Sequence, residues 1–88
     1  MRSYNWFINE IIPKMKGYEI KYVNERGDLG ELNGIQFDSE KKGGYIYFWS
    51  SGYIGLQLVD YEKGEEIISD ILLKEADNSL DNFIKQLI

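Results

Sequence analysis

With 88 residues, a net charge of −5 and neither cysteine nor histidine, the chain is excluded from several classes of protein. The length fits a single domain, residues 1–88, while the missing residue types rule out disulfides, thiolate or imidazole catalysis and sulfur-ligated metals. We therefore expect a cytoplasmic, non-enzymatic protein without metal or cofactor, whose negative charge disfavours direct binding to nucleic acid and to membranes.

The N-terminal segment is expected to form an amphipathic helix over residues 3–13. Its apolar side chains recur at helical spacing, Ser3 can cap the first turn, and Pro13 disfavours continuation. These apolar residues are Tyr4, Phe7, Ile8, Ile11 and Ile12. Because Asn9 and Glu10 interrupt the segment, it matches neither a signal peptide nor a membrane-spanning helix.

A first strand is expected over residues 17–24. Tyr18, Ile20 and Tyr22 alternate there with polar side chains, which is typical of a half-buried strand. The sequence therefore places these three side chains on one face of a sheet.

The next ten residues, 25–34, contain three glycines and four charged side chains. This composition predicts a mobile loop with a turn of its own at Asn33-Gly34. Ile35 and Phe37 then form a short second strand, followed by a turn rich in glycine and charge.

The most informative element is an aromatic hairpin over residues 44–60. A three-residue loop, Ser50-Ser51-Gly52 with Gly52 in the left-handed conformation, is the length that matches apolar side chains across the two strands. The pairs are Phe48–Ile54 and Ile46–Leu56 on one face, and Trp49–Tyr53, Tyr47–Gly55 and Tyr45–Gln57 on the other. We expect the first face, with Leu58 and Ile68, to lie under the helices because it carries no hydroxyl groups. The second face then points outward.

A second hairpin follows, in which a three-residue loop ending at Gly64 predicts a fifth strand. The predicted pairs are Val59–Ile67, Leu58–Ile68 and the like-charged Asp60–Glu66. Residues 69–75 suit a buried turn, a strand extension or the start of a helix.

The C-terminal segment carries an apolar stripe at helical spacing, with Asp77 and Ser79 as candidate caps. The stripe consists of Leu80, Phe83, Ile84, Leu87 and Ile88. These elements together predict an α+β fold: a two-layer sandwich in which a meandering antiparallel sheet of about five strands carries the N- and C-terminal helices on one face.

Two groups of side chains are candidates for partner binding. The aromatic candidates are Tyr45, Tyr47, Trp49 and Tyr53, and the acidic candidates are Asp60, Glu62, Glu65 and Glu66. Aromatic side chains supply large, rigid contact areas at interfaces, but these rings can equally cover bare strand positions such as Gly55. The acidic run, which extends to Asp70, is either a solvated face or an electrostatic guide for a basic partner.

The charge distribution is the observation that supports the second interpretation of the acidic run, and both interpretations stay open. Residues 1–56 hold seven acidic and seven basic side chains, whereas residues 57–81 hold eight acidic side chains against two lysines. A local excess of one sign attracts and steers proteins of the opposite sign.

The stretch GGYIYFWSSGYIGLQLVDYEKGEEII, residues 43–68, resembles small bacterial immunity proteins of polymorphic and contact-dependent growth inhibition toxin systems. The resemblance lies in the turn FWSSG at residues 48–52, the segment VDY at 59–61 and the turn exit GEE at 64–66. It implies a cytoplasmic inhibitor that binds one cognate toxin domain, often basic and often a nuclease, and blocks its active site or substrate path. An adaptor that forms homodimers through its aromatic face is the alternative hypothesis.

Overall fold

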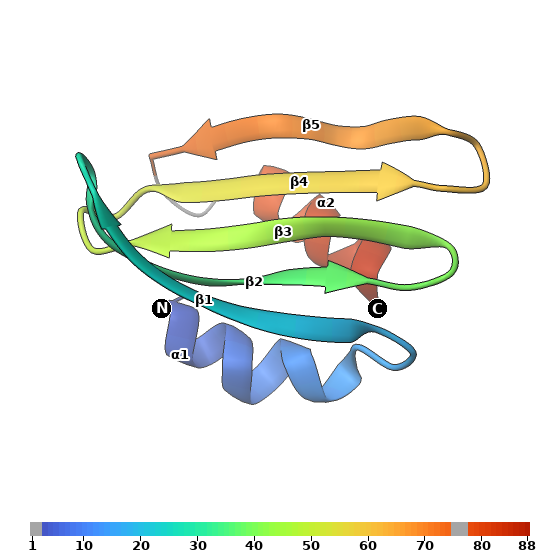
Figure 1. Ribbon diagram of the computed structural model, residues 1–88, viewed down its shortest axis with the longest axis horizontal. Helices are drawn as coiled ribbons and strands as arrows, with labels where there is room; N and C mark the ends of the chain where they lie inside the picture. The colour runs from blue at the N-terminus through green and yellow to red at the C-terminus, as the bar shows by residue number, and fades with distance from the viewer. Residues whose placement is uncertain (1–2, 75–77) are drawn as a thin grey trace.

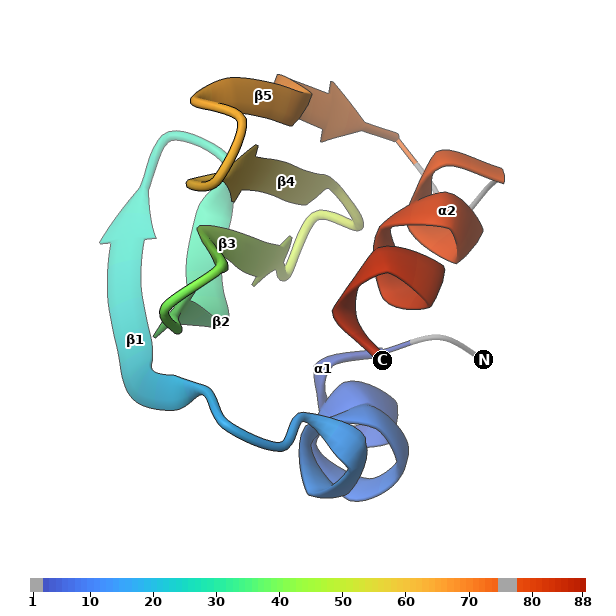
Figure 2. The same cartoon turned by 90° about the vertical axis from the view of Figure 1, so that its right-hand side faces the viewer.

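The computed structural model, which describes residues 3–74 and 78–88, is a two-layer α+β sandwich (Figure 1). One layer is an antiparallel sheet whose five strands lie side by side in chain order. They are β1 (Glu19–Gly27), β2 (Gly30–Asp38), β3 (Lys42–Trp49), β4 (Ile54–Asp60) and β5 (Glu65–Leu73). Both terminal helical segments lie on the same side of this sheet (Figure 2). The predicted fold class is confirmed.

The N-terminal helical segment changes its winding twice. After α1 (Tyr4–Trp6), the chain forms a π-helical turn, η1 (Phe7–Ile11), and a 3-10 turn, η2 (Ile12–Lys14). Ser3 caps the start as expected, because its hydroxyl accepts a hydrogen bond from Trp6 N at 3.2 Å. Pro13 has no N–H and cannot continue the α-helical pattern, so the end of the segment is wound differently from its start.

The hydrophobic core lies between the sheet and the helical segments. α2 (Asn78–Leu87) contributes Phe83, whose ring meets Phe37 edge-on with centroids 5.9 Å apart. The N-terminal segment contributes Phe7, which packs against Phe48 at 6.0 Å. The largest fully buried side chains are Phe7, Phe83, Ile35, Ile46, Leu56, Leu58 and Leu80. The predicted covered face is confirmed, with Ile68 half-buried at its margin. The predicted cap Asp77 lies outside the described residues.

The β3–β4 hairpin has the predicted register. Phe48 pairs with Ile54, Ile46 with Leu56, Tyr47 with Gly55 and Tyr45 with Gln57. At the turn, Trp49 N donates to Tyr53 O at 2.9 Å, and Gly52 has the expected positive φ of 100°.

The mobile loop expected at residues 25–34 is wrong. β1 runs on to Gly27, a two-residue turn follows, and β2 begins at Gly30 with a φ of 102°. Near the turn the strands pair through polar side chains, since Asn24 Nδ2 donates to Asn33 Oδ1 at 2.6 Å, whereas the apolar pairs Ile20–Phe37 and Tyr22–Ile35 lie further from the turn. Charged residues and glycines are compatible with strands here because this end of the hairpin is exposed to solvent.

Tyr22 is more exposed than the apolar alternation of this strand predicts. It lies on the helix side of β1, but 57% of its surface is exposed, because β1 is an edge strand that the helical segments cover only in part.

The predicted register of the second hairpin is right at one pair and wrong at two. Leu58 pairs with Ile68, but a register shift sets Val59 opposite Glu66 and Asp60 opposite Glu65. The turn holds four residues, 61–64, because Asp60 Oδ1 accepts hydrogen bonds from the N–H groups of Glu62 at 3.0 Å and Lys63 at 3.1 Å. The ambiguous stretch continues β5 as far as Leu73.

Candidate functional site

The sheet face opposite the helices, which we call the outer face, carries an aromatic row on its central strand. Tyr45, Tyr47 and Trp49 alternate with core residues along β3 and are half-buried. The rings of Tyr45 and Tyr47 stack with centroids 4.4 Å apart, and Trp49 meets Tyr47 edge-on at 6.1 Å. Gln36 Nε2 donates a hydrogen bond to the Tyr47 hydroxyl at 2.9 Å. These contacts hold the three rings in a defined arrangement.

Glycines lie beneath these rings. A Cβ on Gly34 would lie 2.7 Å from Tyr47 Cδ1, and one on Gly55 would lie 2.9 Å from Trp49 Cζ3. The aromatic side chains therefore fill space that the neighbouring strands leave bare, a structural role that the sequence left open. Their half-exposed surfaces remain available to a partner, so the structural role and the binding role are compatible.

The two predicted groups of side chains lie at different places on the molecule. Tyr53 lies next to Trp49 at the β3–β4 turn, whereas Asp60, Glu62 and Glu65 lie around the β4–β5 turn at the other end of β4. A strand of this length separates its ends by roughly 20 Å. Glu66 stands opposite Val59, on the outer face. The acidic turn is thus separate from the tryptophan, and Asp60 also organises the turn.

Sequence reasoning missed three further acidic residues on the outer face. The strand register places Glu19 and Glu25 of β1, and Asp38 of β2, on the same side as the aromatic row. Lys21 is the basic residue of β1 on this side. Correct pairing of β1 with β2 would have revealed these carboxylates, but the loop expected at residues 25–34 concealed it.

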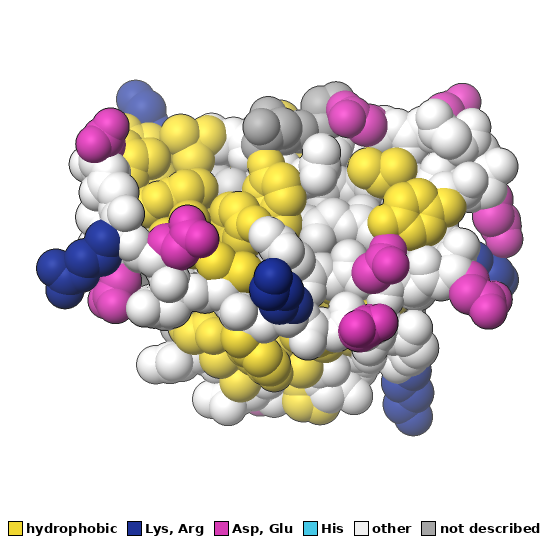
Figure 3. Space-filling model, in the orientation of Figure 1, with side chains coloured by type: hydrophobic (Ala, Val, Ile, Leu, Met, Phe, Trp, Pro, Cys, Tyr) yellow, Lys and Arg dark blue, Asp and Glu magenta, His cyan; other side chains and the backbone are white. Residues whose placement is uncertain are grey.

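An apolar residue of β5 extends the aromatic row. Leu72 stands opposite Gly55 and has 52% of its surface exposed. In Figure 3, which views the outer face, acidic side chains lie around and between patches of hydrophobic surface. The outer face thus combines an ordered aromatic centre with an acidic margin, which suits the binding of a basic protein surface.

Tyr61 ties the β4–β5 turn to this face. Its hydroxyl donates a hydrogen bond to Asp38 Oδ1 at 2.5 Å, and its ring lies over Gly43. The hydrogen bond to Asp38, partial burial and the negative charge of that carboxylate all raise the pKa of Tyr61. The contact therefore orders the end of the outer face nearest the acidic turn.

We predict that Tyr61 ionises above its ordinary pKa and that Asp38→Ala lowers this pKa. Because the folded-state pKa is raised, the stabilisation is present below about pH 10 and is lost as the pH rises through the folded value. An NMR titration of the Tyr61 ring carbon provides the measurement. A Tyr61 that ionises at its ordinary pKa in the folded protein would contradict the prediction.

No family model, curated protein or solved structure matches this chain. Among residues 3–74 and 78–88, no helix has the length and apolar character needed to cross a membrane. Within the same residues, the acidic side chains form no group that could hold a metal ion.

Proposed function

We propose that this chain is a cytoplasmic, non-enzymatic immunity protein that binds a basic bacterial toxin domain and blocks its active site or substrate path. The observation that carries the proposal is the ordered aromatic row with carboxylates on both sides of it. Aromatic centres supply most of the affinity of such interfaces, while the charged margin sets the partner and the association rate.

The outer face alone indicates a partner that is some basic protein. The resemblance of residues 43–68 to immunity proteins is the reason for proposing that this partner is a toxin domain. That segment supplies Tyr45, Tyr47 and Trp49, together with the acidic turn after Asp60. In this proposal the aromatic side chains make the dry centre of the interface. The acidic side chains guide the toxin and pair with its lysines and arginines, as a nuclease that binds phosphate backbones would offer.

The homodimer is the weaker candidate, because the outer faces of two copies carry charge of the same sign. A two-fold dimer brings the same surface of each copy together, so the carboxylates at Glu19, Glu25 and Glu66 would face a surface of the same sign. A basic partner meets no such repulsion.

Growth rescue tests the proposal. The chain is co-expressed with the toxin encoded beside its gene, and an unrelated acidic protein of similar size serves as the control. We expect rescue by this chain alone, a one-to-one complex in sedimentation, and association that slows as salt increases. Failure to rescue, or equal rescue by the control protein, would refute the toxin assignment.

A further inference from the structure

The two edges of the sheet differ in how well they can accept a further strand. Within the described residues, β1 and β5 each pair with a strand on one side only. The pairing of β5 with β4 contains two register shifts, and bulges of this kind bend an edge strand and hinder pairing with another chain. β1 pairs with β2 without a shift and lies at the margin of the molecule, with the helical segments on the other side of the sheet (Figure 2). β1 is therefore the regular edge, at which a strand of another chain can pair.

The hydrogen bonds of Glu31 show which backbone groups of β1 point outward. Glu31 O accepts from Ser50 N at 2.7 Å, and Glu31 N donates to Ser50 Oγ at 2.9 Å, so both groups of Glu31 point toward β3. Arg26, opposite Glu31, therefore has no backbone hydrogen bond to it. Pairs of this kind alternate with hydrogen-bonded pairs along an antiparallel ladder. The N–H and C=O groups that point away from β2 are thus those of Ile20, Tyr22, Asn24 and Arg26.

Two opposite charges stand at equal distances from the middle of β1. Lys21 and Glu25 are exposed, and the register places both on the outer face, with Val23 midway between them. They lie roughly 13 Å apart along the strand, too far to pair with each other. Within residues 3–74 and 78–88, neither forms an ion pair. An antiparallel copy of β1 centred on Val23 would set each of these charges opposite its complement.

We infer that β1 pairs with β1 of a second copy of this chain, antiparallel and with the two-fold axis at Val23. Lys21 of each copy then stands opposite Glu25 of the other, and the outward backbone groups of Tyr22 and Asn24 bind each other. Two-fold symmetry provides this ion pair twice. The chain joins its copy in one continuous sheet, and the regular edge of each copy is used up, so the assembly closes at two chains.

The charges select this register over its neighbours. A shift that centres the pairing on Tyr22 sets Glu19 opposite Glu25, which is a like-charge pair. A shift that centres it on Asn24 sets Lys21 opposite Gly27 and leaves the lysine without a partner. A shift by one residue turns the outward backbone groups of one strand toward groups of the other that already bind β2. Only the register centred on Val23 satisfies both the backbone and the charges.

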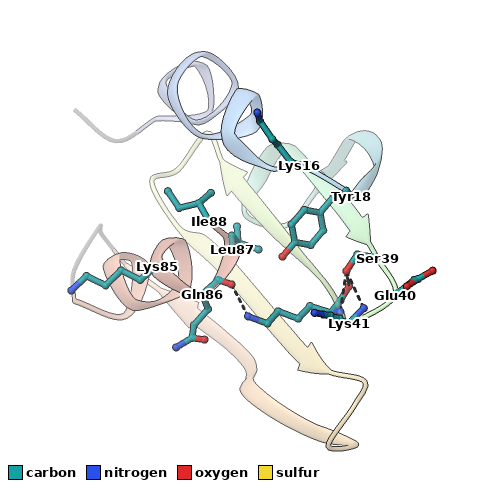
Figure 4. Close-up of a pocket in the computed structure, with 11 residues that line it drawn as sticks. Lys16, Tyr18, Ser39, Glu40, Lys41, Lys85, Gln86, Leu87 and Ile88 are labelled. Atoms are coloured by element: carbon teal, nitrogen blue, oxygen red, sulfur yellow. Dashed lines mark hydrogen bonds between the residues drawn. The ribbon is translucent and has the colours of Figure 1, made fainter.

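β1 is held in place before a second copy binds. Directly before it, the Tyr18 ring packs edge-on against Phe37 with centroids 5.6 Å apart, and it lies between the β2–β3 turn and the end of α2 (Figure 4). Near its other end, Asn24 Nδ2 donates hydrogen bonds to Asn33 Oδ1 at 2.6 Å and to Glu31 Oε2 at 3.1 Å. An edge that is already ordered loses little conformational freedom when it pairs.

The edge dimer does not use the aromatic row, so the inference stands independently of the toxin assignment. Two copies would bind two toxin domains, and the one-to-one ratio is unchanged. The dimer takes up Glu25, but it leaves Glu19, Glu66 and the acidic β4–β5 turn to a basic partner.

Sedimentation equilibrium of charge variants tests the inference. The unmodified chain should change from one copy to two as its concentration rises. Lys21→Glu makes the chain more negative and Glu25→Lys makes it less negative, so a general charge effect would weaken association in the first and strengthen it in the second. The proposed register predicts that both weaken it roughly tenfold, because two attractive pairs become repulsive.

The double variant Lys21→Glu/Glu25→Lys should restore association, because it exchanges the two charges and rebuilds both pairs. Lys63→Glu, which makes the same change in net charge at an exposed position outside β1, should have little effect. A mass of one chain at every concentration, or a double variant no better than the single ones, would overturn the inference. Thermal melts establish that the variants are folded.

A single introduced thiol tests the position of the two-fold axis. The chain has no cysteine, so Val23→Cys can form a disulfide only between copies. Opposed residues of a pair without backbone hydrogen bonds have Cα atoms about 4.5 Å apart, within the range that a disulfide spans. Glu19→Cys is the control on the same face of β1, because position 19 stands opposite Gly27 in the dimer. Val23→Cys should form a covalent dimer much faster under oxidation, and equal rates would refute the register.

Discussion

Gly34→Ala should destabilise the protein by about 3 kcal/mol, the upper part of the range for overpacked sites. A Cβ at this position of β2 would overlap the carbonyl oxygen of Ile46 and lie 2.8 Å from the Cα of Tyr47. Backbone atoms of the neighbouring strand cannot move aside as the end of a side chain can, so the sheet itself must shift. A fall in Tm of roughly 4–8 °C per kcal/mol should accompany the loss, since the domain is small.

Gly27→Ala is the matched control for this change. Gly27 lies in the same hairpin, but a Cβ there would meet no atom within 4 Å, and its φ is not positive. The substitution reduces the flexibility of the unfolded chain to the same extent at both sites, so the difference between the variants reports the packing. Urea unfolding of both proteins supplies the comparison. Equal stability of the two variants would show that β2 does not need glycine at position 34.

The β3–β4 hairpin could be predicted pair by pair because two independent constraints agreed. Its apolar side chains match across the strands in only one register, and a glycine stands where the loop needs a positive φ. The same reasoning was less successful for β4–β5. There, Asp60 binds the N–H groups of its own turn and lengthens the loop by one residue, which moves Glu65 rather than Glu66 opposite it.

The turn end of the β1–β2 hairpin could not be recognised from composition, since the apolar pairs Ile20–Phe37 and Tyr22–Ile35 lie at its other end. Asn24 and Asn33 pair through their side chains, and Gly34 is needed because Ile46 and Tyr47 of a third strand lie against it. Contacts between strands distant in the sequence leave no periodic signal. For the same reason, the sequence identified the aromatic part of the outer face but missed Glu19 and Glu25 at its margin.

Trp49→Ala should weaken binding to the proposed toxin by about 2 kcal/mol, which is roughly 30-fold in Kd. The indole is half-buried at one end of the aromatic row, where it contacts Tyr47 and covers Gly55. Truncation removes both the contact area and the ordered edge of the row. Calorimetry with a catalytically inactive toxin provides the measurement, and thermal melts establish that the variant is folded.

Tyr22→Ala controls for the loss of an aromatic side chain outside the proposed interface. Tyr22 is 57% exposed but lies on the helix side of β1, so it should not contact a partner bound to the outer face. An equal loss of affinity in Tyr22→Ala and Trp49→Ala would place the interface elsewhere.

Gly55→Ala tests whether binding requires the present orientation of the Trp49 indole, because this variant keeps the indole but displaces it. A Cβ on Gly55 would lie 2.9 Å from Cζ3 and 3.0 Å from Cη2 of Trp49, and both atoms belong to the far edge of a side chain that can rotate away. The stability cost should therefore be smaller than that of Gly34→Ala, where backbone atoms are in the way. Affinity for the toxin should still fall, because the displaced ring no longer presents its ordered surface. If Gly55→Ala binds normally while Trp49→Ala does not, the toxin needs the indole but not its present orientation.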